Sequence, residues 1–254
     1  MLRCFKADLQ VHTCLSPCGD LSMSPQRIVA EALRQGLDII AITDHNSAKN
    51  VPAVIAAAGG TSLTVLAGIE VCTREEAHVL AVFDTVASAS ALQALVYERL
   101  HGHNDPDAFG LQVIANAADE VEGFEEKLLI GAADVSVEDV VRSTHRLNGL
   151  AIAAHVDRES YSVIGQLWFI PKTVVFDALE ISAATSDVDA RKRFSDCMRF
   201  TFVRNSDAHF LNDIGNQTTR FMLEEPTVGE IARALRCEGG RRVLPSEPGS
   251  SGAR

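Results

Sequence analysis

The sequence predicts an α/β fold in which buried strands alternate with amphipathic helices. Short apolar runs of strand length recur along the 254 residues, and helix start and stop residues lie between them. A chain of this length with 46% hydrophobic residues can bury a substantial core, so one domain is the default. The alternation fits an open doubly wound sheet or a barrel, and in both architectures functional residues collect at the carboxyl ends of strands.

The first predicted strand begins the stretch Ala7–Asp20, which alternates apolar and polar residues and then enters a loop rich in Cys, Pro and Gly. Six further apolar runs are suited to buried parallel strands. They are Leu37–Thr43, Leu63–Val71, Ala77–Phe83, Leu150–Val156, Ala178–Ser182 and Phe200–His209.

Helix signals lie between these runs. Ser24 and Pro25 begin a helix that Gly36 ends, and Thr227 lies three residues before Glu230, which is the spacing of a capping box. Another helix begins at Ser136 and ends before Gly149; His145, near its end, is interpreted as a cation that compensates the helix dipole.

Residues 1–245 are expected to form a single domain. Within it, residues 104–130 are less regular, which indicates a lid or an insertion, and residues 246–254 are expected to be a disordered tail. No stretch approaches the length of a membrane helix, and the N-terminus lacks the apolar core of a signal peptide, so we expect a cytoplasmic protein. The sequence predicts no oligomeric state.

Charge and cysteine content narrow the classes of partner. The formal net charge of −11 disfavours a broad, sequence-independent grip on nucleic acid, whereas small anionic substrates stay compatible if metal ions supply positive charge. Six cysteines are too sparse for a disulfide scaffold, so reduced thiols are expected.

Carboxylates and imidazoles occur repeatedly where the predicted strands begin or end. A single histidine beside an apolar run is usually a satisfied core or surface residue, but burying this many titratable groups is costly unless another charge neutralises them. A metal cluster would supply that charge. The residues are Asp8, His12, Asp44, His45, Glu70, His78, His155, Asp207 and His209, and the amide of Gln10 lies between the first two.

In this order the residues resemble the polymerase and histidinol phosphatase family, the PHP domains. That family has an H-x-H motif, a T-D-H motif, a Glu, further single histidines and a closing D-x-H. The matching residues here are His12, His45, Glu70, His78, His155, Asp207 and His209. Gln10 stands where the motif has its first His. The resemblance implies a distorted seven-stranded β/α barrel with the metal site at its C-terminal mouth.

The resemblance also implies a ligand set for two or three divalent metals. Glu70 would bridge two metals; His12, Asp207 and Gln10 would hold the first, and His78 and His155 the second. His45 and His209 would belong to a third metal, whose last ligand comes from the loop after the first strand. Both Cys18 and Asp20 are in reach, and the spacing leaves the choice open. Imidazole and carboxylate ligands fit Zn, Mn or Fe.

Such a cluster predicts a metal-dependent phosphoric ester hydrolase in which Glu70, His155 and Asp207 are catalytic. Metals activate water and can clamp the attacking and leaving oxygens at phosphorus. Arg158 is a candidate to bind the phosphate, with a surface ion pair to Asp157 or Glu159 as the favoured alternative, and Arg204 is a weaker candidate for the same role. Asp8 and Asp44 are candidates to orient a ligand imidazole, with a capping role as the alternative.

The predicted substrate is a small phosphorylated metabolite or nucleotide. An alternative is an exonuclease acting on oligonucleotide ends, so that nucleic acid would be a partner only as an oligonucleotide substrate; the lack of a basic stripe counts against it. A second alternative is a weakened PHP domain that binds a metal or phosphorylated ligand without turnover. Gln10 motivates it, because an uncharged amide is a poor substitute for imidazole at zinc.

Overall fold

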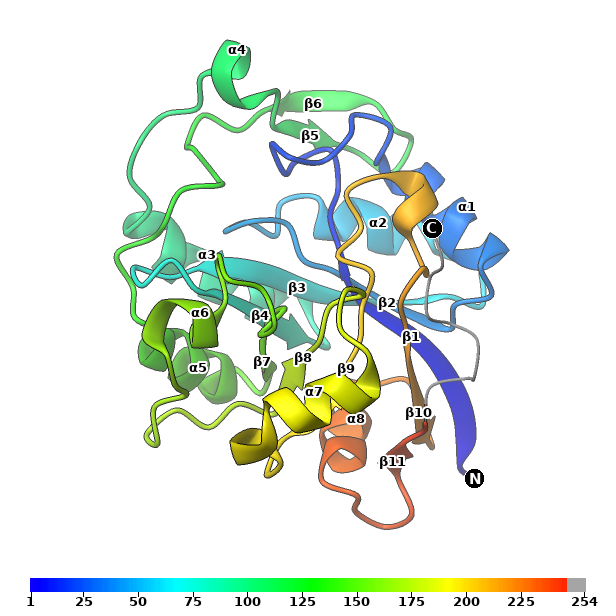
Figure 1. Cartoon of the computed structure of the whole chain (residues 1–254). Helices are drawn as coiled ribbons and strands as arrows, with labels where there is room; N and C mark the ends of the chain where they lie inside the picture. Colours follow the sequence, from blue (N-terminus) through cyan, green and yellow to red (C-terminus); the bar gives the residue numbers. More distant parts are fainter. Residues whose placement is uncertain (246–254) are drawn as a thin grey trace.

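The computed structural model describes residues 1–245 and is built on a nine-stranded mixed sheet (Figure 1). Its strand order is β11-β10-β1-β2-β3-β4-β7-β8-β9, and β5 and β6 form a separate hairpin. The strands are β1 (Arg3–Val11), β2 (Ile39–Ile42), β3 (Thr64–Cys72), β4 (His78–Phe83), β5 (Val113–Ala115), β6 (Val121–Phe124), β7 (Leu150–Ala153), β8 (Ala178–Glu180), β9 (Thr201–Val203), β10 (Thr219–Leu223) and β11 (Arg242–Val243).

The sheet has the barrel character that the sequence predicted. The chain leaving β9 returns to the end of β1, where the Ala208 carbonyl accepts from His12 N–H at 3.0 Å and Ala208 N–H donates to the Gln10 carbonyl at 3.2 Å. This contact nearly closes a ring of seven strands, β1, β2, β3, β4, β7, β8 and β9. The sheet has nine strands rather than seven because β10 and β11 continue it beyond β1, pairing antiparallel.

The expectation that all the strands run parallel is wrong for β4. It pairs antiparallel with both β3 and β7, because only five residues separate the end of β3 from its start. A connection this short can form a hairpin but not a crossover helix. As a result the start of β4, with His78, lies at the same rim as the end of β3.

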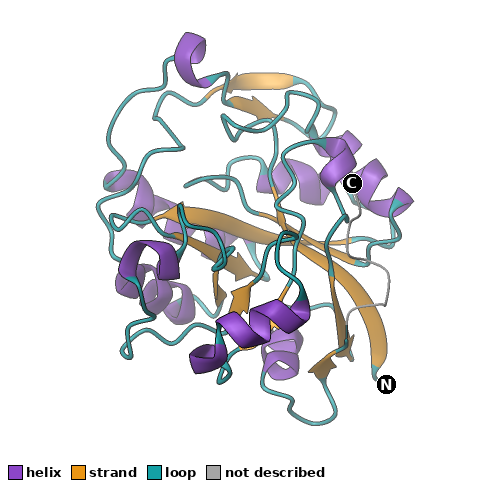
Figure 2. Cartoon of the chain, in the orientation of Figure 1, coloured by secondary structure: helices purple, strands orange, loops and turns teal. Residues whose placement is uncertain are grey.

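Most of the helices cover the outer face of the barrel (Figure 2). The helices are α1 (Pro25–Arg34), α2 (Val51–Ala57), α3 (Val86–Glu98), α4 (Pro106–Phe109), α5 (Val137–Arg146), α6 (Val163–Leu167), α7 (Asp187–Arg193) and α8 (Val228–Leu235), with 3-10 turns at Ser195–Cys197 and Leu211–Asp213. Two helices lie elsewhere: α4 is beside the β5–β6 hairpin and buries no residue, and α8 packs on the opposite side of the sheet from α1, α2, α3 and α5. The predicted signals hold: Gly36 follows α1 with φ +66°, and the Ser136 and Thr227 side chains cap α5 and α8.

Apolar side chains form two layers, one on each face of the sheet. Ile40, Ile69 and Ala81 belong to the layer that packs against α1, α2, α3 and α5. Leu9, Leu66 and Ile152 belong to a second cluster on the other side of their strands. Because side chains alternate along a strand, the second layer fills the barrel interior. The polar residues described below lie at one end of that interior.

Residues 104–130 fold as α4 followed by the β5–β6 hairpin, above the loop after β1 (Figure 1). Val113 N–H donates to the Cys14 carbonyl at 2.9 Å, and Asn50 Nδ2 donates to the Val113 carbonyl at 3.0 Å. These bonds anchor one side of the segment, and its role as a lid stays a prediction. The predicted tail, residues 246–254, lies outside the described residues. Among residues 1–245, no helix is both long and apolar enough to cross a membrane.

Candidate metal centre

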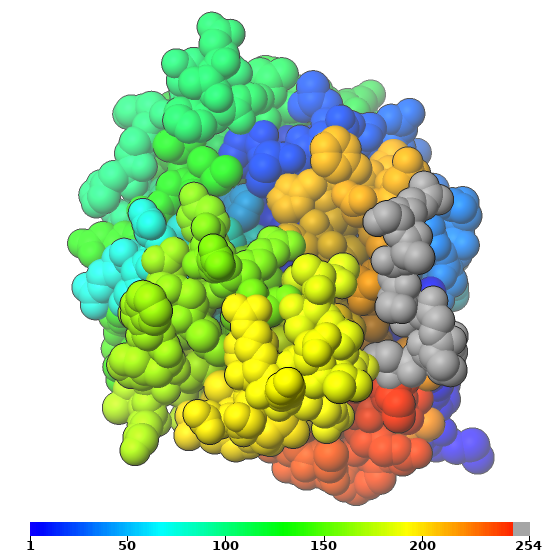
Figure 3. Space-filling view, viewed as in Figure 1, coloured from blue at the N-terminus to red at the C-terminus, as the bar shows by residue number. Residues whose placement is uncertain are grey.

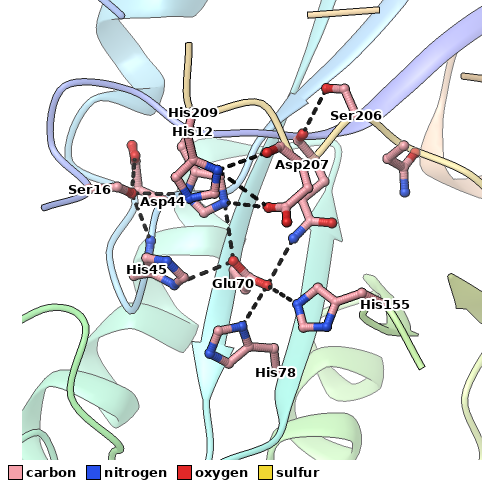
Figure 4. Close-up of polar contacts among 12 residues, drawn as sticks. His12, Ser16, Asp44, His45, Glu70, His78, His155, Ser206, Asp207 and His209 are labelled. Atoms are coloured by element: carbon pink, nitrogen blue, oxygen red, sulfur yellow. Dashed lines mark hydrogen bonds and ion pairs between the residues drawn. The ribbon is translucent and has the colours of Figure 1, made fainter. Parts of the chain in front are cut away.

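Imidazole and carboxylate side chains converge on one another at one mouth of the barrel (Figure 4), and they come from six strands. Five of these strands contribute at or just beyond their carboxyl ends, while β4 contributes at its amino end because it runs antiparallel. The converging residues are His12 after β1, His45 after β2, Glu70 in β3, His78 in β4, His155 after β7, and Asp207 and His209 after β9.

Glu70 lies at the centre of the cluster and is 1% exposed. Its Oε1 lies 2.9 Å from His78 Nδ1 and 3.4 Å from His155 Nε2. Its Oε2 lies 3.2 Å from His12 Nε2 and 3.3 Å from His45 Nδ1. One carboxylate therefore contacts four imidazoles, two through each oxygen, which is the arrangement expected of a ligand that bridges two cations.

Asp207 links the cluster to an arginine in a neighbouring loop. Its Oδ1 lies 3.4 Å from His12 Nε2, while its Oδ2 pairs with Arg158 Nη1 at 2.8 Å. The residue has φ +53°, and His155 has φ +27°, both in the region that a residue with a side chain rarely adopts. Such strain is found where surrounding contacts fix a side chain for function. The loops after β7 and β9 thus meet over the cluster, on the face drawn in Figure 3.

The electrostatics of these groups are strongly coupled. Burial disfavours the charge on Glu70, but the histidines around it hold the pKa of its carboxyl well below the usual range. Burial lowers the pKa of His12 and of His78, yet the carboxylates of Asp207 and Glu70 raise that of His12 to about 10, and Glu70 raises that of His78 to about 9. The raised pKa values of His12 and His78 and the lowered pKa of Glu70 have one cause, the attraction between an imidazolium and a carboxylate.

The donor atoms fit divalent metal ions. Five buried donor or acceptor atoms in this cluster have no hydrogen-bond partner, and such orphans are rare in native proteins. They are Gln10 Oε1, His12 Nε2, His45 Nδ1, Glu70 Oε2 and His155 Nδ1. Three groups each have ligand atoms within 4.8 Å of one another: His12, His45 and His209; His45, Glu70 and His78; and His12, Glu70 and Asp207. Nitrogen and oxygen donors of this kind suit Zn, Mn or Fe.

Gln10 is fully buried and points at the same carboxylate. Its Nε2 donates to Glu70 Oε1 at 2.9 Å, and its Oε1 is one of the atoms without a partner. An amide can turn over by rotation of its terminal torsion, which would present the oxygen to a cation instead. The structure therefore brings Gln10 to the cluster together with His12.

The two predicted carboxylates outside the cluster differ in their contacts. Asp44 Oδ1 accepts from Ser16 Oγ at 2.7 Å, and Ser16 Oγ lies 2.9 Å from His12 Nδ1, so Asp44 orients His12 through one hydroxyl. Asp8 contacts no imidazole: its carboxylate accepts from the N–H groups of Ser206 and Gly215 at 3.0 and 2.9 Å. Burial raises the pKa of Asp8 to about 6. Asp8 thus holds the segment that carries Asp207.

Neither candidate for the third metal's last ligand belongs to a ligand group in the described residues. Asp20 is exposed; its carboxylate accepts from Ser22 N–H at 2.8 Å, and its N–H donates to the His209 carbonyl at 2.9 Å. Cys18 is also exposed, and partial desolvation together with the nearby Glu70 raises the pKa of its thiol to about 12. The loop brings both residues to the rim, and the choice between them stays open.

The two arginines predicted to bind phosphate differ in their positions relative to the cluster. Arg158 lines a cavity of about 760 Å³ in front of the cluster, and Arg193 from α7 lines it as well. Arg204 is outside that lining, because its guanidinium binds Asp187 Oδ1 at 2.7 Å and the Ser182 carbonyl at 2.8 Å. Arg204 therefore fastens the start of α7 instead of facing the cluster.

Sequence reasoning missed Glu180 and Asn205. Glu180 Oε2 accepts from His155 N–H at 2.9 Å, and Glu180 Oε1 accepts from Asn205 Nδ2 at 2.7 Å. Burial raises the pKa of Glu180 to about 8. Asn205 in turn accepts from Leu9 N–H at 2.8 Å. The pair ties β8 to the loops that carry His155 and Asp207. In the sequence, the signal for Glu180 was a carboxylate at the end of a predicted strand, as for Glu70.

Comparison with known families agrees with this geometry. The PHP domain family matches residues 8–175, about two thirds of the chain, and a PHP-associated region matches residues 190–238. The chain belongs to the PHP domain family. The two matched regions meet in the barrel, since Val11 from the first forms a β-bridge with Ala208 from the second.

Individual relatives are more distant. The uncharacterized protein YqxK of Bacillus subtilis is 29% identical over 102 residues, which are 39% of this chain and 26% of that protein. Two solved structures share the fold. The lesion-specific endonuclease PfuEndoQ from Pyrococcus furiosus has a TM-score of 0.72 at 17% identity, covering 95% of this PHP chain and 58% of its own. A protein from Bifidobacterium adolescentis, described as a putative metal-dependent phosphoesterase, has a TM-score of 0.58 at 18% identity. The match covers 91% of this chain and 95% of that protein.

Proposed function

We propose that this PHP domain is a metal-dependent phosphoric ester hydrolase that acts on a small phosphorylated metabolite or nucleotide. The observation that carries the proposal is the Glu70 carboxylate, buried among four imidazoles whose donor atoms are partly without partners. A cluster of this kind serves no packing purpose, because burying it uncompensated is costly.

The residues have distinct proposed roles. Glu70 would bridge two metals; His12, Asp207 and Gln10 would complete one site and His78 and His155 another, while His45 and His209 would hold a third. Divalent metals supply positive charge that activates water and stabilises the phosphoryl group in an in-line displacement. Glu180 fixes the His155 backbone, and Ser16 and Asp44 fix the His12 ring.

Among the described residues, Arg158 is our candidate to bind a phosphate. Its side chain is 46% exposed and lines the cavity while pairing with Asp207 at 2.8 Å. A guanidinium has five N–H donors, so it can keep that pair and still donate to a phosphate oxygen. This contact would orient the ester in front of the cluster.

A nuclease activity is the second candidate. It is favoured by the similarity of the fold to the lesion-specific endonuclease over 95% of this chain. The chain spans 58% of that neighbour and 26% of the curated relative, so much of either protein has no counterpart here. The net charge of −11 opposes a broad nucleic-acid grip and favours the small-substrate proposal.

The experiment is a hydrolysis assay with a panel of phosphate monoesters and diesters and labelled single strands, with Zn, Mn or Fe added to the protein. We expect phosphate release from a small ester that is lost on chelation and in His155→Ala. Progressive shortening of the labelled strand, lost in the same variant, would favour the nuclease. Tight binding of a phosphorylated ligand without product under any metal would contradict both and favour a binding module.

A further inference from the structure

A tyrosine forms part of the wall of the cavity in front of the cluster. Tyr161 lies in the loop between β7 and α6, six residues after His155, and lines the same cavity as His78, His155 and Arg158. Tyr161 is 47% exposed, so part of its side chain is open to a ligand.

The position of this ring is fixed by its surroundings. Tyr161 has φ +58°, which is rare for a bulky side chain, and its carbonyl accepts from His78 N–H at 2.9 Å. The ring stacks on the His78 imidazole with centroids 5.0 Å apart and an interplanar angle of 27°. A strained backbone that holds an aromatic ring beside a reactive cluster indicates a functional constraint.

The cavity combines two kinds of surface. Apart from Ile130, Tyr161 and Ala184, its lining is polar, and it includes the guanidinium groups of Arg158 and Arg193. Its volume of about 760 Å³ is in the range of small-molecule sites. Imidazoles, carboxylates and guanidiniums suit a phosphate with its metals, whereas a flat, partly exposed aromatic ring suits another planar ring.

We propose that Tyr161 determines substrate specificity by stacking on the base of a nucleotide whose phosphate lies at the cluster. The inference rests on the proposed phosphoesterase function and narrows its substrate to a phosphoester that carries a nucleobase. Stacking of one base on an aromatic side chain changes binding by roughly tenfold or more. The hydroxyl group of Tyr161 is not required by this role.

The test compares adenosine 5′-monophosphate with ribose 5-phosphate, which share the phosphate and the sugar and differ in the base. In the unaltered protein we expect kcat/KM to favour the nucleotide by about tenfold. Tyr161→Leu should lose most of this preference because its KM for the nucleotide rises, whereas Tyr161→Phe should keep the preference. Trp168→Leu is the matched control, because Trp168 is exposed and is not part of the cavity lining.

Three results would overturn the inference: no preference for the nucleotide in the unaltered protein, an equal loss on both substrates in Tyr161→Leu, or a loss of preference in Tyr161→Phe. The metal content of each variant is measured alongside and must equal that of the unaltered protein. A loss of metal in Tyr161→Leu would mean that the tyrosine positions His78 and does not bind the base. If no phosphoester is hydrolysed, the proposed function fails. The binding affinities of the two compounds, measured by calorimetry, then test the Tyr161 inference: the nucleotide should bind more tightly, and Tyr161→Leu should lose this difference.

Discussion

Gln10 donates its side-chain N–H to Glu70 Oε1 at 2.9 Å, inside a fully buried contact. This glutamine occupies the position where the PHP motif has its first histidine, and it lies among the imidazoles that contact the same carboxylate. The exchange is therefore local to one proposed metal position, while His12, His45, His78 and His155 all lie within 3.4 Å of the Glu70 carboxylate.

Gln10→His should increase metal retention at the first proposed site. Imidazole is a better ligand than an uncharged amide for Zn, Mn or Fe, so we expect roughly tenfold slower loss of metal to a chelator. Metal content per chain during dialysis measures it. Gln26→His, on α1 away from the cluster, controls for a new surface histidine. Unchanged retention in Gln10→His would mean that this position does not ligate a metal.

Asp44→Asn should weaken both the metal site and the fold. The Asp44 carboxylate accepts from Thr13 N–H at 2.7 Å, from Thr13 Oγ1 at 2.8 Å and from Ser16 Oγ at 2.7 Å, and an amide cannot accept from all three. We expect a loss of about 1–3 kcal/mol in the free energy of unfolding, measured in urea without metal. Metal affinity should fall about 10- to 100-fold.

Asp134→Asn, at an exposed carboxylate, should change neither quantity. If Asp44→Asn destabilised the chain but left metal affinity intact, the link through Ser16 to His12 would have no functional role.

Arg158→Gln should raise KM for phosphate esters while leaving the metal content unchanged. We expect about a 10- to 100-fold loss in kcat/KM, with partial recovery in Arg158→Lys because lysine keeps the charge but not the two-pronged geometry. Arg146→Gln on α5 is the matched control. Loss of metal in Arg158→Gln would show instead that the arginine acts through its ion pair with Asp207, by positioning that carboxylate.

His145 on α5 gives a pH-dependent test of the fold that does not involve the cluster. Its Nε2 lies 2.8 Å from Asp177 Oδ2, and this contact raises the pKa of the imidazole above its ordinary value. A raised folded-state pKa gives stability that is fully present below the ordinary value, near 6.5, and is lost as the pH rises through the folded pKa.

His145→Gln should therefore destabilise the chain by about 0.5 kcal/mol near pH 5.5, and the difference should disappear near pH 9. Unfolding in urea at both values measures it, and His101→Gln, at an exposed histidine, should show no such trend. A difference that is the same at both values would remove the ion pair as its cause.

Strand and helix positions were largely predictable from the sequence, because apolar runs and capping residues report burial directly. The direction of β4 was not, since a buried apolar run reads the same in either direction. The short Thr73–Ala77 connection was the available signal for a hairpin. The strands β10 and β11 were missed because they are only five and two residues long, which gives no clear pattern in the sequence.

The cluster was predictable as a set of residues, because each member lies where a strand begins or ends and matches a motif of the family. Contacts between side chains on loops far apart in the sequence were not predictable. Glu180 meets Asn205, and Tyr161 meets His78, only after the loops fold. Arg204 and Arg158 looked alike as single charged residues, and only their contacts separate them.

Metal content and phosphoesterase activity, measured together on the same purified protein, test the central claim most directly. We predict two or three equivalents of Zn, Mn or Fe per chain and hydrolysis of a small phosphate ester. Both should be lost on chelation and restored by adding metal, and Glu70→Gln should reduce both, while Glu122→Gln on exposed β6 should not. A protein that retains less than one metal per chain and hydrolyses no phosphoester with any of the three metals added would contradict the account.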